Sequence, residues 1–239
     1  MKYTETKLTP WLLLGLLLGL SSYDVAGATT TISSSHVDIF EAEYEQDGTN
    51  APTVHLGVHA GTNHYEPANV LLEVGSAAYG STVAFSSTIT SLLGASAWIL
   101  PADLEVAASL GLIEAGVAKV GFPSGSVTFT MVGAGSGNPG NFALFTAGSS
   151  IRLSATASEV GTSSFSITTG HIHYNWGFSS PGTYTFDMKA SYTDAALGNL
   201  ESAVETYTFN VIPEPACGTL LLIGLVGWVA TRKRVVLKE

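Results

Sequence analysis

The stretch "GHIHYNWGFSSPGTYTFDMKASYT", residues 170–193, decides the fold that we expect for this chain. Polar and apolar side chains alternate on both sides of a Ser-Pro-Gly segment, which is typical of strands with one buried face. The apolar face of the first strand comprises Ile172, Tyr174 and Trp176. His171, His173 and Asn175 point the other way. Matching the apolar faces of the two halves predicts a β-hairpin in which Trp176 lies opposite Phe186.

That hairpin has two consequences. Its large aromatic side chains would pack against an opposite sheet, where burial of apolar area stabilises the fold. Its register also places Lys189 beside His173, and an ammonium group at that position disfavours a bound cation.

The rest of the chain repeats the pattern of short alternating strands separated by turns rich in Gly, Ser and Pro. We expect strands at residues 53–59, 69–74, 81–85, 97–100, 126–132, 141–146, 151–156, 170–178, 183–191 and 203–212. One helical pattern covers residues 102–110, and Gly111 would end it. The predicted fold class is all-β, an antiparallel, immunoglobulin-like β-sandwich.

The first predicted strand, which includes residues 36–45, changes phase in its middle. Val37 and Ile39 have one parity, whereas Phe40 and Ala42 have the other. A β-bulge near positions 39–40 would bury both sets and leave the glutamates beyond it facing outward.

Composition excludes some functions. The 239 residues are 46% hydrophobic and 12% charged, so the chain should fold rather than stay disordered. Between Thr29 and Ile212 we count three Lys or Arg and fifteen Asp or Glu, a net charge of −12. Nucleic acid is therefore not an expected partner, because phosphate binding needs clustered cations. This segment also contains no cysteine, so it offers no disulfide and no thiolate.

The N-terminus has the pattern of a signal peptide. Basic residues precede a short apolar stretch, and Ala26 and Ala28 stand where signal peptidase reads small side chains. We expect residues 1–28 to form a signal helix that is cleaved after Ala28; the alternative is a retained N-terminal anchor.

Residues 212–235 form a tail in three parts. Pro213, Glu214 and Pro215 come first, then an interrupted apolar run predicted as a transmembrane helix, and then a basic cluster. That cluster consists of Arg232, Lys233 and Arg234 and would stay on the cytoplasmic side. The tail resembles a PEP-CTERM sorting signal. The resemblance implies a Gram-negative bacterium, processing by an exosortase, and a neighbourhood of exopolysaccharide. An ordinary C-terminal membrane anchor is the alternative.

The domain between the signals, residues 29–211, resembles the choice-of-anchor M domain. The resemblance rests on "HVDIFEAEYE", "LGVHAGTNHYEPANVLLEV", "GSGNPGNFALF" and "HIHYNWGFSSPGTYTF", which occur in this order together with Trp98. It implies a surface location, after secretion across the inner membrane, and no established reaction. Some relatives are encoded beside metal-type transporters, which suggests a link to metal capture.

All six histidines lie within this domain, and two of them stand two apart on a predicted strand. Neutral imidazoles at such spacing can coordinate zinc-type cations. The candidate ligands are His171 and His173, with His36 or Asp38 as a further ligand if the first strand lies beside them. The alternatives are solvent-facing histidines, with His55 opposite Glu43, or calcium on the acidic edge at residues 41–47.

No nucleophile elbow, zinc-protease motif or P-loop occurs in the chain, and we expect a protein that is not an enzyme. The sequence favours a secreted, envelope-anchored, non-enzymatic sandwich that acts in adhesion or in the exopolysaccharide matrix. Signal peptidase, exosortase and the inner membrane would be its processing partners. The alternative function is a divalent-metal-binding module linked to metal uptake.

Overall fold

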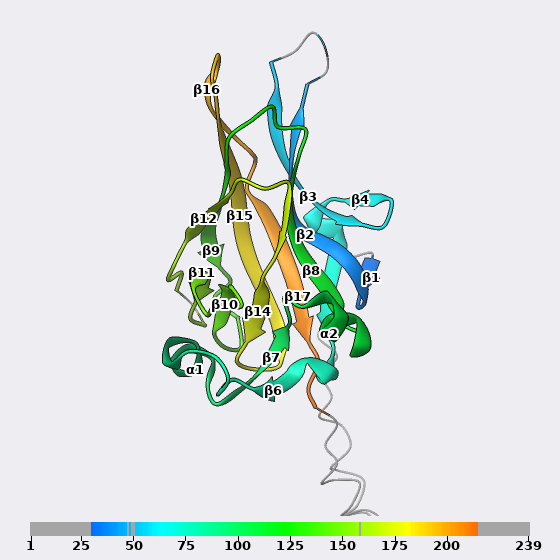
Figure 1. Ribbon diagram of the computed structural model, residues 1–239, viewed down its shortest axis with the longest axis vertical. Helices are drawn as coiled ribbons and strands as arrows, with labels where there is room; N and C mark the ends of the chain where they lie inside the picture. The colour runs from blue at the N-terminus through cyan, green and yellow to red at the C-terminus, as the bar shows by residue number, and fades with distance from the viewer. Residues whose placement is uncertain (1–29, 47, 49–50, 158, 215–239) are drawn as a thin grey trace, which may run out of the picture.

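The computed structural model describes residues 30–46, 48, 51–157 and 159–214. The described residues form mainly β-strands in three sheets, with two short α-helices near one end (Figure 1). Signal-peptide residues Ala26 and Ala28 lie outside the described residues, as do Pro215 and the predicted basic cluster. The all-β fold class is confirmed.

The largest sheet has seven strands. Its strands in spatial order are β1 (Thr30–Ile32), β5 (Val70–Val74), β17 (Glu205–Val211), β15 (Gly182–Asp194), β9 (Val127–Ala134) and β12 (Ser164–Ile167), with β16 (Gly198–Glu201) paired to β15. Strands β1 and β17 both pair with β5 in parallel, whereas the other pairs are antiparallel. The expectation of purely antiparallel sheets is therefore wrong for this sheet.

Two five-stranded sheets complete the fold. One contains, in spatial order, β11 (Ile151–Ala155), β10 (Phe142–Phe145), β14 (Asn175–Phe178), β7 (Ser96–Leu100) and β6 (Tyr79–Ser81). The other contains β13 (His171–His173), β8 (Ile113–Val120), β2 (Ser35–Glu45), β3 (Thr53–Ala60) and β4 (Asn63–Tyr65). We call the latter the histidine sheet. It is also mixed, because β2 and β8 run parallel.

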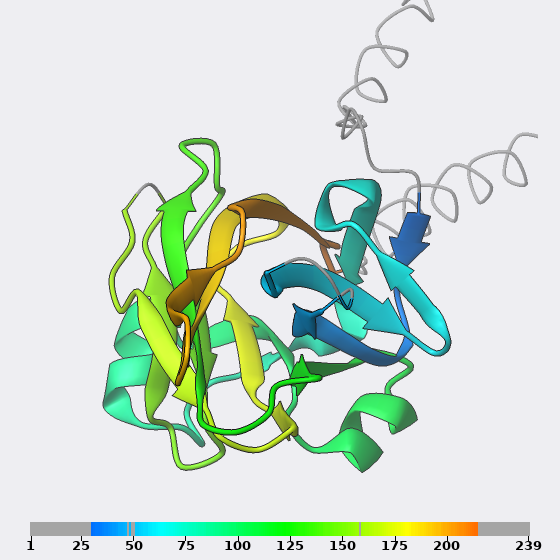
Figure 2. The same ribbon diagram turned by 90° about the horizontal axis from the view of Figure 1, so that it is seen from above.

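Aromatic side chains from all three sheets meet in one core. Phe40 of the histidine sheet contacts Trp176 of β14, with 4.8 Å between ring centroids, and Tyr207 of β17, at 4.9 Å. Trp176 also lies 5.8 Å from Phe209. Seen from above, β2 and β3 lie on one side of the molecule and the green strands of the largest sheet on the other (Figure 2). The arrangement is sandwich-like, with one shared core.

The predicted hairpin at residues 170–193 is wrong. Its first half divides into β13 and β14, which belong to two different sheets, and its second half is β15 in the third. Trp176 lies opposite Leu144 and Leu100 rather than Phe186. The assignment of faces holds for Tyr174 and Trp176, which are buried in the core, but not for Asn175, which is also buried and accepts a hydrogen bond from the backbone of Ala102. Alternation reports which side is buried, but any buried face can satisfy it.

The bulge in the first strand is confirmed. The registers of β2 with both β3 and β8 shift between Asp38 and the residues that follow. Ile39 and Phe40 are both fully buried as a result. Before and after the bulge, the polar side chains of β2 project from the same outer face of the histidine sheet.

The predicted helix is confirmed as α2 (Leu104–Ser109), which is followed by Gly111 in the left-handed region at φ 65°. Asp103 caps it by accepting hydrogen bonds from the backbone of Glu105 and Val106. A second helix, α1 (Ser87–Leu93), was not expected, and the strand predicted at residues 81–85 is wrong, because β6 (Tyr79–Ser81) ends at the first of these residues. Two single turns of 3-10 helix flank β5, at Pro67–Asn69 and Ser76–Ala78.

The end of the domain is fixed just after β17. The indole nitrogen of Trp98 donates to the carbonyl of Ile212 at 2.8 Å, and Pro213 and Glu214 follow as exposed residues. Among the described residues, no helix is long and apolar enough to cross a membrane.

Candidate metal centre

All six histidines project from the outer face of the histidine sheet. The opposite face of the same strands is apolar and belongs to the core; it includes Val37, Leu56, Val58 and Val117. Strand pairing aligns His173, Gly116, Asp38, His59 and His64 in one row across the five strands. Alternation along each strand thus gathers residues that are far apart in the sequence on one surface.

Three imidazoles converge at one end of this face. His36 Nε2 lies 3.3 Å from His171 Nε2, which lies 2.6 Å from His173 Nε2. The three ligand atoms are all within 4.8 Å of one another. Tetrahedral zinc with Zn–N bonds of 2.0–2.1 Å places its nitrogen ligands about 3.3 Å apart. The first separation matches this value, and the second is shorter. A tetrahedral ion bound by all three nitrogens would therefore require His171 Nε2 and His173 Nε2 to move apart by about 0.7 Å.

The remaining ring nitrogens face groups that orient the imidazoles. His171 Nδ1 lies 2.8 Å from Asp38 Oδ1, and His173 Nδ1 lies 2.9 Å from the carbonyl oxygen of Ala115. An acceptor near Nδ1 favours the tautomer that carries its proton there, which would make Nε2 the ligand atom when a metal replaces the contacts between the rings. Such carboxylate or carbonyl partners behind ligating histidines are a regular feature of metal sites.

Gly116 makes room for this arrangement. A Cβ atom at this position would lie 2.6 Å from His171 Cε1 and closer still to Asp38 Oδ1. The β8 strand separates β2 from β13, so a side chain here would block the contact between Asp38 and His171. Glycine is required for space, not for an unusual backbone angle.

Burial and neighbouring charge favour neutral imidazole at His171. Desolvation lowers the pKa of this histidine, and the adjacent His173 and His36 lower it further, while Asp38 opposes both effects. Neutral imidazole is the form that binds metal. Asp38 itself is only 7% exposed and carries no lysine or arginine partner in any ion pair of the described residues.

The expected lysine is elsewhere. Lys189 lies on β15 in the seven-stranded sheet, where its ammonium group contacts Glu201 at 3.0 Å. The predicted neighbourhood of Lys189 and His173 is wrong, because it relied on the hairpin that does not form. With it goes the electrostatic argument against a cation beside His173.

The sequence-based candidates therefore divide into two roles. The structure brings His36, His171 and His173 together. Strands β2 and β13 do not pair with each other, because β8 lies between them. Asp38 lies behind His171 and is not among the converging atoms. Sequence reasoning missed Gly116 and the Ala115 carbonyl, because the small residues of β8 show no clear alternation.

The acidic edge expected to attract calcium also has a different composition. Glu41 is 2% exposed and groups with His59 and His64, whereas Glu43 and Glu45 group with His55. His55 does lie opposite Glu43 in the β2–β3 register. Imidazoles thus contribute to both groups, and calcium prefers all-oxygen ligands.

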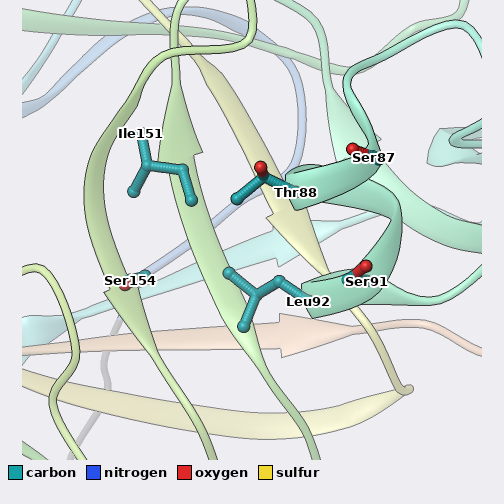
Figure 3. Close-up of a pocket in the computed structure, with 6 residues that line it drawn as sticks. All are labelled: Ser87, Thr88, Ser91, Leu92, Ile151 and Ser154. Carbon is teal, nitrogen blue, oxygen red and sulfur yellow. The ribbon is translucent and has the colours of Figure 1, made fainter.

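A shallow surface pocket lies elsewhere, between α1 and β11 (Figure 3). It is lined by Ser87, Thr88, Ser91, Leu92, Ile151 and Ser154. Hydroxyl and aliphatic groups alone form this lining, so it offers no acid, base or metal ligand stronger than a hydroxyl. The histidine face therefore remains the better candidate site.

Comparisons of the chain with family models, with curated proteins and with solved structures found no match.

Proposed function

We propose that this protein is a divalent-metal-binding domain of the bacterial cell envelope, with His36, His171 and His173 as ligands for zinc or a similar cation. The observation that carries the proposal is the convergence of three Nε2 atoms, separated by 3.3 and 2.6 Å along the group. The geometry thus favours the function that the sequence ranked second, metal binding, over adhesion as the primary activity.

Solvent-facing histidines explain this arrangement less well. The three imidazoles direct Nε2 at one another, and protonating all of them would place like charges together. The carboxylate and carbonyl behind His171 and His173 add orientation that a merely exposed side chain does not need.

The site suits capture and release of a cation. Three protein ligands leave a fourth position open in a tetrahedral site. His36 and His171 lie at the surface, so a transporter or a soluble chelator could approach the metal there. We assign no reaction to the site, in keeping with the absence of a catalytic motif in the sequence.

The location belongs to the same proposal. The resemblances to a PEP-CTERM signal and to the choice-of-anchor M domain support secretion, processing by signal peptidase and an exosortase, and attachment near the exopolysaccharide matrix. We also propose that the fold is an immunoglobulin-like sandwich, which the packing of its sheets around one shared core supports. An envelope position would expose the histidine face to metals outside the inner membrane.

Zinc should raise the melting temperature of the metal-free full-length protein at pH 7.5. Ligands that bind only the folded state stabilise it by mass action, so the rise should grow with zinc concentration. It should disappear below about pH 6, where protons compete for imidazole. Differential scanning calorimetry with and without chelator measures both effects.

The variant His171→Ala/His173→Ala should lose the part of the rise that depends on the three-histidine site while keeping the melting temperature of the metal-free protein. His55→Ala, which changes a histidine outside the group, should keep the full rise. Superimposable melts of zinc-loaded and chelator-treated wild type at neutral pH would refute the three-histidine site.

A further inference from the structure

A second group of ligand atoms lies further along the same face of the histidine sheet. Glu41 stands on β2 just after the bulge, His59 on β3 and His64 on β4. His59 and His64 are direct partners in the β3–β4 register. Three neighbouring strands therefore contribute one residue each, and none of these residues belongs to the three-histidine group.

Both imidazoles direct the same atom at one carboxylate. His59 Nδ1 lies 3.3 Å from Glu41 Oε2, and His64 Nδ1 lies 3.1 Å from Glu41 Oε1. The two rings are stacked, with 4.3 Å between centroids and 8° between planes. One ligand atom from each of the three residues falls within 4.8 Å of the others. A small cation could therefore contact two nitrogens and a carboxylate oxygen at once.

Glu41 is an unusual residue to bury. Its side chain is 2% exposed, and Oε1 is buried without a well-directed hydrogen bond. A buried carboxylate needs a compensating positive charge. Glu43 adds a second carboxylate, 3.3 Å from His64 Nδ1, and so increases that need.

The described basic side chains do not meet this need. Lys119 contacts the carbonyl of Gly125, Lys189 pairs with Glu201, and Arg152 lies over the ring of Tyr174 at 6.0 Å. Within residues 30–46, 48, 51–157 and 159–214, the only basic side chains that contact Glu41 and could offset its charge are those of His59 and His64. A divalent cation would do so while leaving both imidazoles neutral.

We propose that Glu41, His59 and His64 form a second divalent-cation site, so that the histidine face binds two metal ions. Two imidazoles with one carboxylate are a ligand set that zinc accepts in proteins. Glu43 lies next to His64, where it holds that ring and adds negative potential. The proposal rests on its own residues and does not require the three-histidine site to bind metal.

The test is zinc stoichiometry by equilibrium dialysis of the metal-free full-length protein at pH 7.5. In the His171→Ala/His173→Ala variant one tight equivalent should remain. Adding Glu41→Gln, which keeps the shape of the side chain and removes its charge, should abolish that equivalent. Adding Glu201→Gln instead, a matched change at a distant carboxylate, should leave it in place. Circular dichroism in chelator verifies that each variant folds.

The two sites fail in different ways. If the His171→Ala/His173→Ala variant binds no zinc, or if its remaining equivalent survives Glu41→Gln, the second site is refuted. If the same double change removes no equivalent from the wild-type total, the three-histidine site fails instead. Glu41→Gln alone should lower the zinc stoichiometry of the protein by one equivalent. The equivalent that depends on His171 and His173 should remain.

Discussion

Gly116 has no side chain, and the space that this leaves is needed for the proposed three-histidine site to form. It lies between Asp38 on β2 and His173 on β13 in the register of the histidine sheet. Its missing Cβ leaves the space in which Asp38 and His171 meet. A residue with no functional group thus controls the geometry of those that have one.

Gly116→Ala should weaken zinc binding by about 10- to 100-fold, the range typical of lost outer-sphere support. The added methyl group would separate Asp38 from His171 and turn the imidazole away. Gly80→Ala is the matched control, because Gly80 is also a strand glycine and has open space where a Cβ would be placed. Competition with a fluorescent zinc chelator measures both variants. Equal affinities would show that the space at Gly116 is not needed.

Tyr184 sets a limit on stability at high pH. Its hydroxyl group donates to the carbonyl of Ser180 at 3.0 Å, and burial raises the pKa of this phenol to about 12. An unfolded tyrosine ionises near pH 10, so between about pH 10 and 12 the unfolded state releases a proton that the folded state keeps. The free energy of unfolding should therefore fall as pH rises through this range.

Tyr184→Phe should make that fall shallower by roughly 2–3 kcal/mol in total, since one group with a raised pKa is removed. Urea unfolding at pH values from about 8 to 12 measures how the free energy of unfolding changes with pH in both proteins. The values at about pH 10 and 12 are decisive. At pH 8 the variant should be somewhat less stable, because the hydrogen bond to Ser180 is lost. Identical slopes would contradict the assignment to Tyr184.

At the scale of elements, β14 is the middle strand of its five-stranded sheet. It pairs with β10 on one side and β7 on the other. Trp176 at its centre is fully buried and contacts rings of the histidine sheet and of the largest sheet. The preceding strand in the chain, β13, instead carries His171 and His173, two of the proposed ligands. Two adjacent strands thus separate stability from binding.

Trp176→Ala should cost about 3–5 kcal/mol in the free energy of unfolding, because it opens a cavity where three sheets meet. His171→Ala should change the stability of the metal-free protein by no more than about 0.5 kcal/mol, since its ring lies on the outer face. Guanidinium melts in the presence of chelator compare the two. Equal losses would mean that the faces of this segment are exchanged.

At the scale of the whole molecule, the six histidines lie on the outer face of one sheet, and the opposite face of that sheet packs in the core that it shares with the largest sheet. The first and last described strands, β1 and β17, both pair with β5 in the largest sheet. The segments that the sequence predicts as signal and anchor flank these strands. Attachment through the tail would thus hold the protein by its seven-stranded sheet and not by the outer face of the histidine sheet.

Processing at the N-terminus provides a separate prediction for the whole chain. If residues 1–28 are a cleaved signal, the secreted protein should begin at Thr29, one residue before β1. Signal peptidase favours the small residues at Ala26 and Ala28. N-terminal sequencing and intact mass of the protein from a Gram-negative host would check this. A mature form that retains Met1 would contradict the secretion argument.

The candidate site shows where sequence reasoning succeeded and where it stopped. Alternation in residues 170–176 placed His171 and His173 outside and Trp176 inside, and the phase change in β2 predicted the bulge that aligns Asp38 with the later glutamates. Both results depend on local geometry, because successive side chains of a strand point to opposite faces. Strand partners are not local, so the apolar face of β14 matched β15 in sequence although the two lie in different sheets.

Local pattern alone therefore determined the all-β class, the helix α2, the burial of Trp176 and the outward positions of His171 and His173, but it missed α1 and β8. Tertiary structure decided what pairs with what. It inserted β8 between β2 and β13, brought His36 within 3.3 Å of His171 across 135 positions of sequence, and moved Lys189 to another sheet. The physical reason is that burial can be satisfied by many pairings, whereas packing the three sheets around one aromatic core permits a specific one.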